Sequence, residues 1–422
     1  MNSSARGGGQ HSLKSNMIWN SVGSMVYLAC QWLITVFVVR LSAGYDAAGV
    51  LALGMAVSNI FSPIGYYKIR AYQVSDVSGE FSDGIYMGSR VVTTVAALVV
   101  MIVYGVATCN IEALPAVYLY GIFSIGPIVV DVLHGVDQRL GRMDIIGKSY
   151  IMRGVLSLAS FCLVFSASQS LELAFASMAI LTFTAILSYD WRQTSQLSPG
   201  IKIEFDHARI ARLLRICLPA VVALLCCSAV PSIPRQVLGS VSGTDILGIY
   251  ASIAAPVLIV QMGAQYVYTP LLTEFASRFN DGDGSGFWRL FSKATIAIIG
   301  ITIAGVVFFL VFGDQILELL YGAAIVEYSY ALTPLIICTV VTAYVWFVGD
   351  LLIAVRDMRG NLLIYLLSFV TCVVSMYPFI SSFGMNGASY CVILSYGLSV
   401  GWGFLRLRAA CKKAAPQFTE VD

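Results

Sequence analysis

The chain has 422 residues, of which 58% are hydrophobic and only 11% are charged. A soluble domain carries about 25% charged residues, so this composition excludes a single water-soluble globule, a disordered protein and a nucleic-acid binder. The formal net charge of +2 gives no basis for an acidic macromolecular partner. The chain is therefore predicted to fold in lipid.

Twelve apolar stretches are long enough to cross a bilayer. A hydrocarbon core of about 30 Å needs about 20 apolar residues per helix, and backbone polar groups in lipid must be satisfied within each segment, so helices are expected. The expected spans are 17–39, 47–67, 91–110, 114–133, 150–168, 171–189, 216–238, 246–268, 291–312, 331–353, 361–380 and 386–405. The first run exceeds 20 residues without an A-x-A site, so we expect a retained helix rather than a cleaved signal.

The positive charges predict the orientation of these helices. With the N-terminus placed in the cytoplasm, 23 of the 25 Lys and Arg residues fall on the inner side, and only Arg40 and Arg235 fall outside. Cytoplasmic loops of membrane proteins carry an excess of Lys and Arg, and a missed or extra helix would scramble this asymmetry. Twelve helices with both termini in the cytoplasm are therefore predicted.

The longest polar gap divides the spans into six and six. The expected domains are an N-terminal six-helix lobe over 1–195, a cytoplasmic linker over 196–215 and a C-terminal six-helix lobe over 216–422. Within the linker, residues 207–215 are amphipathic, with Ile210 and Leu213 on one side and Arg209 and Arg212 facing elsewhere. This segment is interpreted either as an interfacial helix leading into the seventh span or as a helix end with basic anchors.

The two halves share a short pattern on the outer side. Arg40-Leu-Ser-Ala-Gly44 and Asp46-Ala-Ala-Gly49 match Arg235-Gln-Val-Leu-Gly239 and Asp245-Ile-Leu-Gly248. Six helices per half return the chain to the same side, so the repeats would be parallel. Transporters built from such repeats hold their substrate between the halves and work by alternating access.

No catalytic or metal-ligating constellation emerges from the sequence. His11, His134 and His207 are scattered, and the ten cysteines show no CxxC spacing. Asp281-Gly-Asp283 resembles the D-x-D of sugar-nucleotide transferases, but it falls in a short loop where a Gly/Asp turn explains it. A carrier without catalytic residues, metal or cofactor is expected.

Four stretches resemble a known transporter family. They are Asp131-Val-Leu-His-Gly-Val-Asp-Gln-Arg-Leu-Gly-Arg-Met-Asp144 running on to Gly154, Arg70-Ala-Tyr-Gln-Val-Ser-Asp76, Gly248-Ile-Tyr-Ala-Ser252 and Gly384-Met-Asn-Gly-Ala388. The chain resembles the bacterial polysaccharide transporters, the Wzx-type O-antigen flippases of the multidrug/oligosaccharidyl-lipid/polysaccharide (MOP) superfamily. The resemblance implies an all-α, MATE-like pair of parallel six-helix lobes in the bacterial plasma membrane.

The same resemblance implies a substrate and partners. The substrate would be an undecaprenyl-diphosphate-linked oligosaccharide of O-antigen, capsule or a similar glycan, which the protein flips from the inner to the outer leaflet. Membrane lipids and the polysaccharide assembly machinery are the other implied partners. A diphosphate of about two negative charges needs cations inside the membrane, where isolated charges cost roughly 3 kcal/mol or more and are functional candidates by default.

Candidate substrate-binding residues follow from this requirement. They are Arg153 inside the fifth span, the repeat-related Arg40 and Arg235, Lys68 and Arg70 at the cytoplasmic mouth, and Tyr66, Tyr67 and Tyr72, which could stack on sugars. Each has a plainer interpretation. The repeat-related arginines could snorkel from helix ends, the mouth residues could be positive-inside anchors, and the tyrosines could form an interfacial belt.

Two intramembrane carboxylates are candidates for coupling to H⁺ or Na⁺. Asp350 lies in the tenth span and Asp131 in the fourth, and their plainer role is an ion pair with Arg356 or Arg139. The first span has no acidic residue, although drug/cation antiporters of the superfamily commonly use one there. A cation-coupled multidrug antiporter, marked by an acid buried in a lobe, remains the alternative function. A membrane glycan polymerase or ligase is less favoured because it needs a large outer loop.

Overall fold

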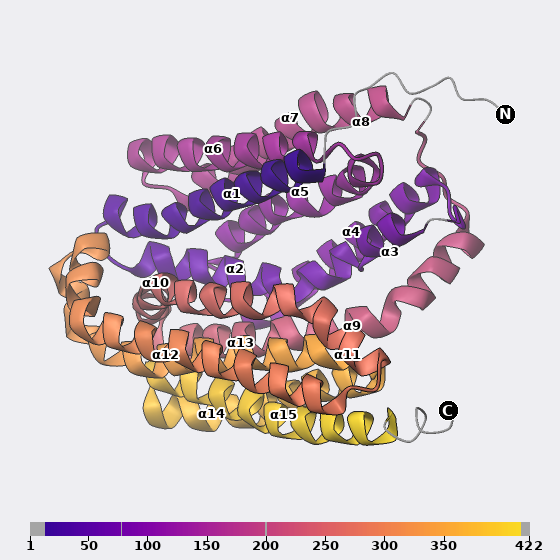
Figure 1. The fold of residues 1–422 in the computed structure, drawn as a ribbon. Coiled ribbons are helices and arrows are strands. Elements are labelled where there is room, and N and C mark those ends of the chain that lie inside the picture. The colour runs from indigo at the N-terminus through magenta and orange to yellow at the C-terminus, as the bar shows by residue number, and fades with distance from the viewer. Residues whose placement is uncertain (1–12, 77, 199–200, 415–422) are drawn as a thin grey trace. The chain divides into compact units, whose positions relative to one another are not determined.

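The computed structural model describes residues 13–76, 78–198 and 201–414, and the described residues form helices and turns without a strand (Figure 1). The chain divides into two compact units, Met1–Val221 and Val222–Asp422, called here the N unit and the C unit. The division falls inside helix α9 (His207–Ser242).

The N unit is built from helices that pair along their length. Its elements are α1 (Leu13–Leu41), α2 (Asp46–Tyr66), α3 (Ile69–Ser75), α4 (Asp83–Thr108), α5 (Leu114–Arg139), α6 (Met143–Ser168), α7 (Leu171–Ala185), the π-helical turn η1 (Ile186–Asp190), α8 (Trp191–Leu197) and the first part of α9. Helix α1 packs on α6, α6 on α7, and α5 on both α2 and α7.

The C unit repeats this helical construction. After the rest of α9 come α10 (Thr244–Tyr268), η2 (Thr269–Leu271), α11 (Leu272–Asn280), α12 (Gly284–Tyr321), η3 (Ala323–Ala331), α13 (Leu332–Ala354), α14 (Met358–Phe383) and α15 (Met385–Ala414). Helix α15 packs on α13 and α14, and α10 packs on α12 and α13. Buried aromatic side chains, including Phe275, Phe287 and Phe347, fill the space between these helices.

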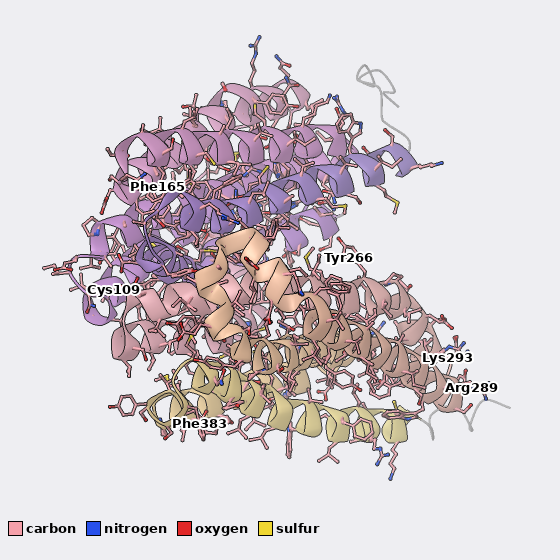
Figure 2. All side chains as sticks on the ribbon, turned by 90° about the vertical axis from the view of Figure 1, so that its left-hand side faces the viewer. Cys109, Phe165, Tyr266, Arg289, Lys293 and Phe383 are labelled. Carbon is pink, nitrogen blue, oxygen red and sulfur yellow. The ribbon has the colours of Figure 1, made fainter. Side chains whose placement is uncertain are left out.

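Among the described residues, twelve helices are long and apolar enough to cross a membrane, which confirms the predicted number of spans. Many of their large apolar side chains face outward, as on α12, where Ile296 and Leu310 are 68% and 67% exposed. Large apolar surfaces of this kind suit lipid rather than water. The polar side chains Arg289 and Lys293 lie exposed near the start of α12 (Figure 2). The chain is therefore a multi-pass membrane protein.

Three glycines allow α1 and α6 to approach closely. A Cβ atom on Gly23 would lie 2.5 Å from the Cα of Gly147, and one on Gly154 would lie 3.0 Å from the Cα of Tyr27. Small residues let membrane helices pack backbone to backbone. This approach brings Tyr27 of α1 against Tyr150 of α6, with ring centroids 5.7 Å apart.

The amphipathic segment 207–215 is not a separate interfacial helix. It is the first part of α9, and its apolar residues Ile210 and Leu213 are buried against side chains of α4 and α5. The exposed Arg212 pairs with Glu80 at 2.6 Å. Its apolar face is therefore covered by protein, because the turn before α4 and the start of that helix offer a matching apolar surface.

The predicted topology can be tested at the turns between helices. Reporter fusions after Gly44 and Gly243 are expected to report the outer side, and fusions after Gly141 and Gly282 the inner side, because Lys and Arg gather at the ends near the second pair. Alkaline phosphatase and green fluorescent protein activities measure the two sides. A fusion that reports the opposite side would break the twelve-helix topology.

Candidate functional site

Arg153 lies deeper in its helix than the sequence suggested. It is ten residues from the start of α6, which corresponds to a depth of about 15 Å at 1.5 Å per residue. The side chain is 1% exposed, its Nε donates to Ser149 Oγ at 3.0 Å, and its Cζ lies 5.7 Å and 5.3 Å from the ring centroids of Tyr27 and Tyr150. Nη1 and Nη2 have no hydrogen-bond partner among the described residues.

The repeat-related arginines have different surroundings. Arg40 is exposed in the last turn of α1, whereas Arg235 is half-buried seven residues before the end of α9. Arg235 interacts electrostatically with Tyr250 and Cys338 inside the C unit. The match of the two sequence patterns therefore does not extend to a matching environment.

The residues expected at the cytoplasmic mouth surround a break between α2 and α3. Tyr67 and Lys68 have positive φ values of 48° and 55° there, and Lys68 is exposed. The three tyrosines do not gather into one platform. Tyr66 lies under the guanidinium of Arg90, Tyr67 packs on the apolar cluster around Ile85, and Tyr72 donates to Glu80 at 2.9 Å.

Arg70 lines an open hollow at the same end of the N unit. The hollow has a volume of about 350 Å³ and is lined by Arg70, Ala71, Val74, Ser75 and Gln138. Arg70 donates to Gln138 Oε1 through Nε at 3.1 Å and through Nη2 at 2.8 Å, and its side chain is 21% exposed. A cation therefore faces a space large enough for a polar head group.

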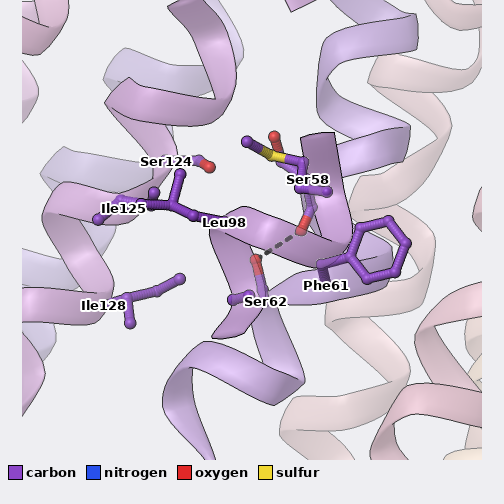
Figure 3. Close-up of a pocket in the computed structure, with 9 residues that line it drawn as sticks. Ser58, Phe61, Ser62, Leu98, Ser124, Ile125 and Ile128 are labelled. Atoms are coloured by element: carbon purple, nitrogen blue, oxygen red, sulfur yellow. Dashed lines mark hydrogen bonds between the residues drawn. The ribbon is translucent and has the colours of Figure 1, made fainter. Parts of the chain in front are cut away.

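A second hollow is too small and apolar to bind a substrate. It holds only about 10 Å³ and lies between α2, α4 and α5, where Leu98, Ile125 and Ile128 project into it (Figure 3). Ser62 donates to the Ser58 carbonyl at its edge, at 2.8 Å, and so satisfies its own hydroxyl (Figure 3).

Asp131 pairs with arginines that its plainer interpretation did not include. Its Oδ2 lies 2.7 Å from Arg90 Nη2 and its Oδ1 lies 3.4 Å from Arg70 Nη1. Arg139, the partner expected from sequence, instead pairs with Asp83 at 2.7 Å. The difference arises because α3 and α4 bring arginines to the Asp131 side of α5, which no spacing along the chain reveals.

The stretch 131–144 joins the predicted cytoplasmic ends of the N-unit helices. Its polar groups bond to other elements as follows: Asp131 to Arg90 and Arg70, His134 to Asp190, Asp137 to Thr194, Gln138 to Arg70, Arg139 to Asp83, and the Gly141 carbonyl to Asn16. These contacts reach α1, α3, α4, η1 and α8. The residues that carry the family resemblance thus fix the arrangement of the unit.

Several buried charged or titratable residues were not singled out from the sequence as site candidates. Arg90 is 2% exposed, His134 is 1% exposed, and Asp137 and Asp190 are both 0% exposed. Asp131, His134 and Asp137 recur at three-residue intervals in α5, which marks one polar stripe on an otherwise apolar helix. The three-residue spacing could have identified the polar stripe from the sequence, whereas no sequence pattern pairs His134 with Asp190.

Asp76 organises the turn between α3 and α4. Burial opposes ionisation of its carboxylate, but hydrogen bonds from the Glu80 and Phe81 backbone N–H groups and from the Tyr86 and Ser78 hydroxyls outweigh that effect and lower its pKa to about 2. This carboxylate ends the Arg70–Asp76 stretch that resembles the transporter family. Its role there is to hold the turn.

Asp76→Asn is expected to destabilise the folded protein by about 2 kcal/mol, because charge-assisted hydrogen bonds are the stronger ones. The folded pKa lies below the unfolded value of about 4, so this contribution is complete above about pH 4 and declines as the pH falls toward 2. Thermal unfolding in detergent should show a stability gap from wild type that narrows below pH 4. The exposed-loop control Asp281→Asn should leave stability nearly unchanged, and an equal loss in both variants would contradict the assigned role.

Asp350 belongs to a polar cluster in the C unit. It is half-buried in α13 and interacts with the phenol groups of Tyr268 and Tyr365, both of which are buried. Nearby, the Tyr396 hydroxyl donates to the Cys227 carbonyl at 2.9 Å. The cluster therefore joins α9, α10, α13, α14 and α15 around one carboxylate.

Several solved transporter structures have a similar fold. The chain is similar to an inward-facing multidrug resistance MATE family transporter of the MOP superfamily, with a TM-score of 0.63, 13% identity, and coverage of 92% of this chain and 99% of that one. It is also similar to a variant of the Vibrio cholerae MATE transporter VcmN, with a TM-score of 0.63, 14% identity, and coverage of 95% of this chain and 96% of that one. A third similar structure is a MOP superfamily transporter from Pyrococcus furiosus, with a TM-score of 0.54, 15% identity, and coverage of 96% of this chain and 97% of that one.

The chain therefore has the twelve-helix, MATE-like fold of the MOP superfamily transporters, which confirms the predicted fold class. The three solved structures are described as transporters. No protein-family model matches the chain. The chain is similar to the capsular polysaccharide biosynthesis protein CapF of Staphylococcus aureus, with 22% identity over 387 residues that cover 90% of this chain and 95% of CapF.

Proposed function

We propose that the protein exports an undecaprenyl-diphosphate-linked oligosaccharide from the inner to the outer leaflet of a bacterial plasma membrane by alternating access. The observation that carries the proposal is the similarity to CapF, because it extends over 90% of a chain that has a transporter fold. CapF is described as a capsular polysaccharide biosynthesis protein. A transporter serves such a pathway by moving the lipid-linked unit across the membrane.

The Arg70 hollow supports this proposal as the place where the diphosphate is first bound. The guanidinium of Arg70 faces a space of about 350 Å³, and the exposed Lys68 lies two residues before Arg70 in the chain. A guanidinium binds phosphate oxygens through paired N–H donors. The sugars would follow the head group, and the prenyl chain would stay in lipid.

The intramembrane cations would then compensate the charge of the diphosphate on its path. The Nη1 and Nη2 atoms of Arg153 have no hydrogen-bond partner among the described residues, and Arg235 is half-buried in the C unit. Asp131 is a poor coupling group because Arg90 and Arg70 already compensate its charge. Asp350, beside Tyr268, remains the coupling candidate from the sequence.

A cation-coupled multidrug antiporter is the second candidate, and a specific observation favours it. The N unit contains carboxylates that are fully buried, Asp137 and Asp190, and a buried acid in a lobe is the feature expected of an antiporter. Against it, α1 contains no acidic residue.

Inactivating the gene in the bacterium that encodes the chain separates the two functions. We expect loss of the cell-surface glycan and accumulation of its lipid-linked repeat unit on the inner leaflet, with unchanged sensitivity to cationic drugs. A plasmid copy of the gene should restore the surface glycan. Normal surface glycan together with increased drug sensitivity would overturn the proposal in favour of the antiporter.

A further inference from the structure

We infer that the N unit contains a proton-binding site, formed by His134, Asp137 and Asp190, through which transport is coupled to a proton gradient. The inference deepens the proposed function and rests on it for the identity of the exported substrate. Neither Asp131 nor Asp350, the coupling candidates from the sequence, belongs to this site.

The site lies where α5 meets the segment from η1 to α8. His134 Nε2 is 3.2 Å from Asp190 Oδ1, and Thr194 Oγ1 donates to Asp137 at 3.0 Å from Oδ1 and 3.2 Å from Oδ2. His134, Asp137, Asp190 and Thr194 are all at most 1% exposed. The two contacts lie about one turn apart along a pair of helices, and the four side chains are called the row here.

Charge balance distinguishes this row from Asp131 and Asp144, two carboxylates of α5 and α6. Asp131 is paired with Arg90, and Asp144 is paired with Arg142 at 2.8 Å. Asp137 instead accepts from the neutral Thr194 hydroxyl, and Asp190 has an imidazole on one oxygen while its Oδ2 has no hydrogen-bond partner among the described residues. Two buried carboxylates beside one imidazole carry an excess negative charge unless the group also holds a proton.

The charged neighbours act on the row from several helices. Arg153 of α6 and Arg70 of α3 act electrostatically on His134, and the ring of Tyr150 lies 5.5 Å from its imidazole. Arg142, Asp144 and Asp190 act in the same way on Asp137, and the phenol of Tyr189 interacts with both Asp137 and Asp190.

The helix geometry marks the same place independently. Asp190 is the last residue of the π-helical turn η1, which interrupts the span between Leu171 and Leu197. Single π-turns are rare and frequently occur at functional sites. The turn sets the direction of Asp190 toward His134, so a change in the charge of this pair acts directly on an irregular, adaptable part of the helix.

A proton fits the site better than a metal ion. The described residues contain no group of three or more His, Cys, Asp or Glu side chains placed to hold a metal. Histidine is also the side chain that exchanges protons near neutral pH. The site would therefore bind a proton in one state of the transport cycle and release it in another.

Infrared difference spectroscopy tests proton binding without any transport assay. Full-length protein in lipid is titrated between about pH 5 and pH 8, the range in which histidine exchanges its proton, and the carboxylic-acid C=O band is followed. We expect a pH-dependent band that is lost or shifted in Asp190→Asn and in Asp137→Asn. The control Asp144→Asn, which removes a buried acid already paired with Arg142, should retain it. Identical bands in wild type and both test variants would overturn the inference.

A vesicle assay tests coupling. Export of the lipid-linked oligosaccharide by wild type should accelerate under an imposed proton gradient, and Asp190→Asn should lose this acceleration while Asp144→Asn keeps it. Acceleration by a Na⁺ gradient alone, or an unchanged proton response in both Asp190→Asn and Asp137→Asn, would contradict the inference. Absence of any oligosaccharide export by wild type would instead contradict the proposed function, and the infrared result would still decide on the proton site.

Discussion

Arg153→Ala is expected to reduce glycan export by more than tenfold while leaving membrane insertion intact. Arg153 lies about 15 Å along α6 from its start, inside a helix long and apolar enough to cross the membrane, where charge is costly and retained for function. Its two unpartnered donors and its stacking against Tyr27 and Tyr150 hold a positive charge ready to compensate an anion. Export of surface glycan by a strain carrying only this variant measures the effect.

Two further variants make this result specific. Arg153→Lys keeps the charge but loses the planar contact with the tyrosine rings, so partial export is expected. Arg289→Ala removes an exposed arginine of α12 and should export normally (Figure 2). Arg235→Ala, in the other unit, is expected to lose export as Arg153→Ala does. Normal export by both alanine variants, at equal protein levels, would show the two arginines to be structural anchors.

Arg90→Met is expected to cause the largest loss of stability, about 3–5 kcal/mol, because it removes the buried partner of an ion pair and leaves the half-buried Asp131 without its closest cation. Arg90 also donates to the Gly65 carbonyl at 2.5 Å, so its removal loosens α2 from α4 as well. The double variant Arg90→Met, Asp131→Leu should recover part of the loss because no uncompensated charge remains. Unfolding in detergent measures all three proteins, and a double variant no more stable than the single one would contradict the ion-pair account.

The number of spans was predictable because lipid imposes one rule on every helix. Each of the twelve expected stretches overlaps one of the twelve candidate spans, but the ends differ: α4 ends at Thr108, before the expected 110, and α12 extends from Gly284 to Tyr321, well beyond the expected 291–312. Helix ends were less predictable because polar residues continue a helix into the interface. Neither the break at Tyr67 and Lys68 nor the π-turn at η1 could be predicted, since no Gly or Pro occupies either position.

The candidate site was only partly predictable. Arg153 was a candidate because a charged residue inside an expected span is costly, and the structure shows that its side chain is buried. The environment of Asp131 was not predictable, because its partners Arg90 and Arg70 come from helices whose contacts depend on tertiary packing. The stripe of Asp131, His134 and Asp137 was visible in the sequence, but its significance depended on Asp190, which is more than fifty residues away.

The central claim is that this chain moves a lipid-linked oligosaccharide across a membrane. Purified protein reconstituted into vesicles with a fluorescent undecaprenyl-diphosphate oligosaccharide tests it most directly, with accessibility to an added glycosidase as the measure of leaflet. The account predicts that wild-type protein renders the inner-leaflet pool accessible and that Arg153→Ala does not. A pool that stays inaccessible with folded wild-type protein, with and without an imposed ion gradient, would contradict it.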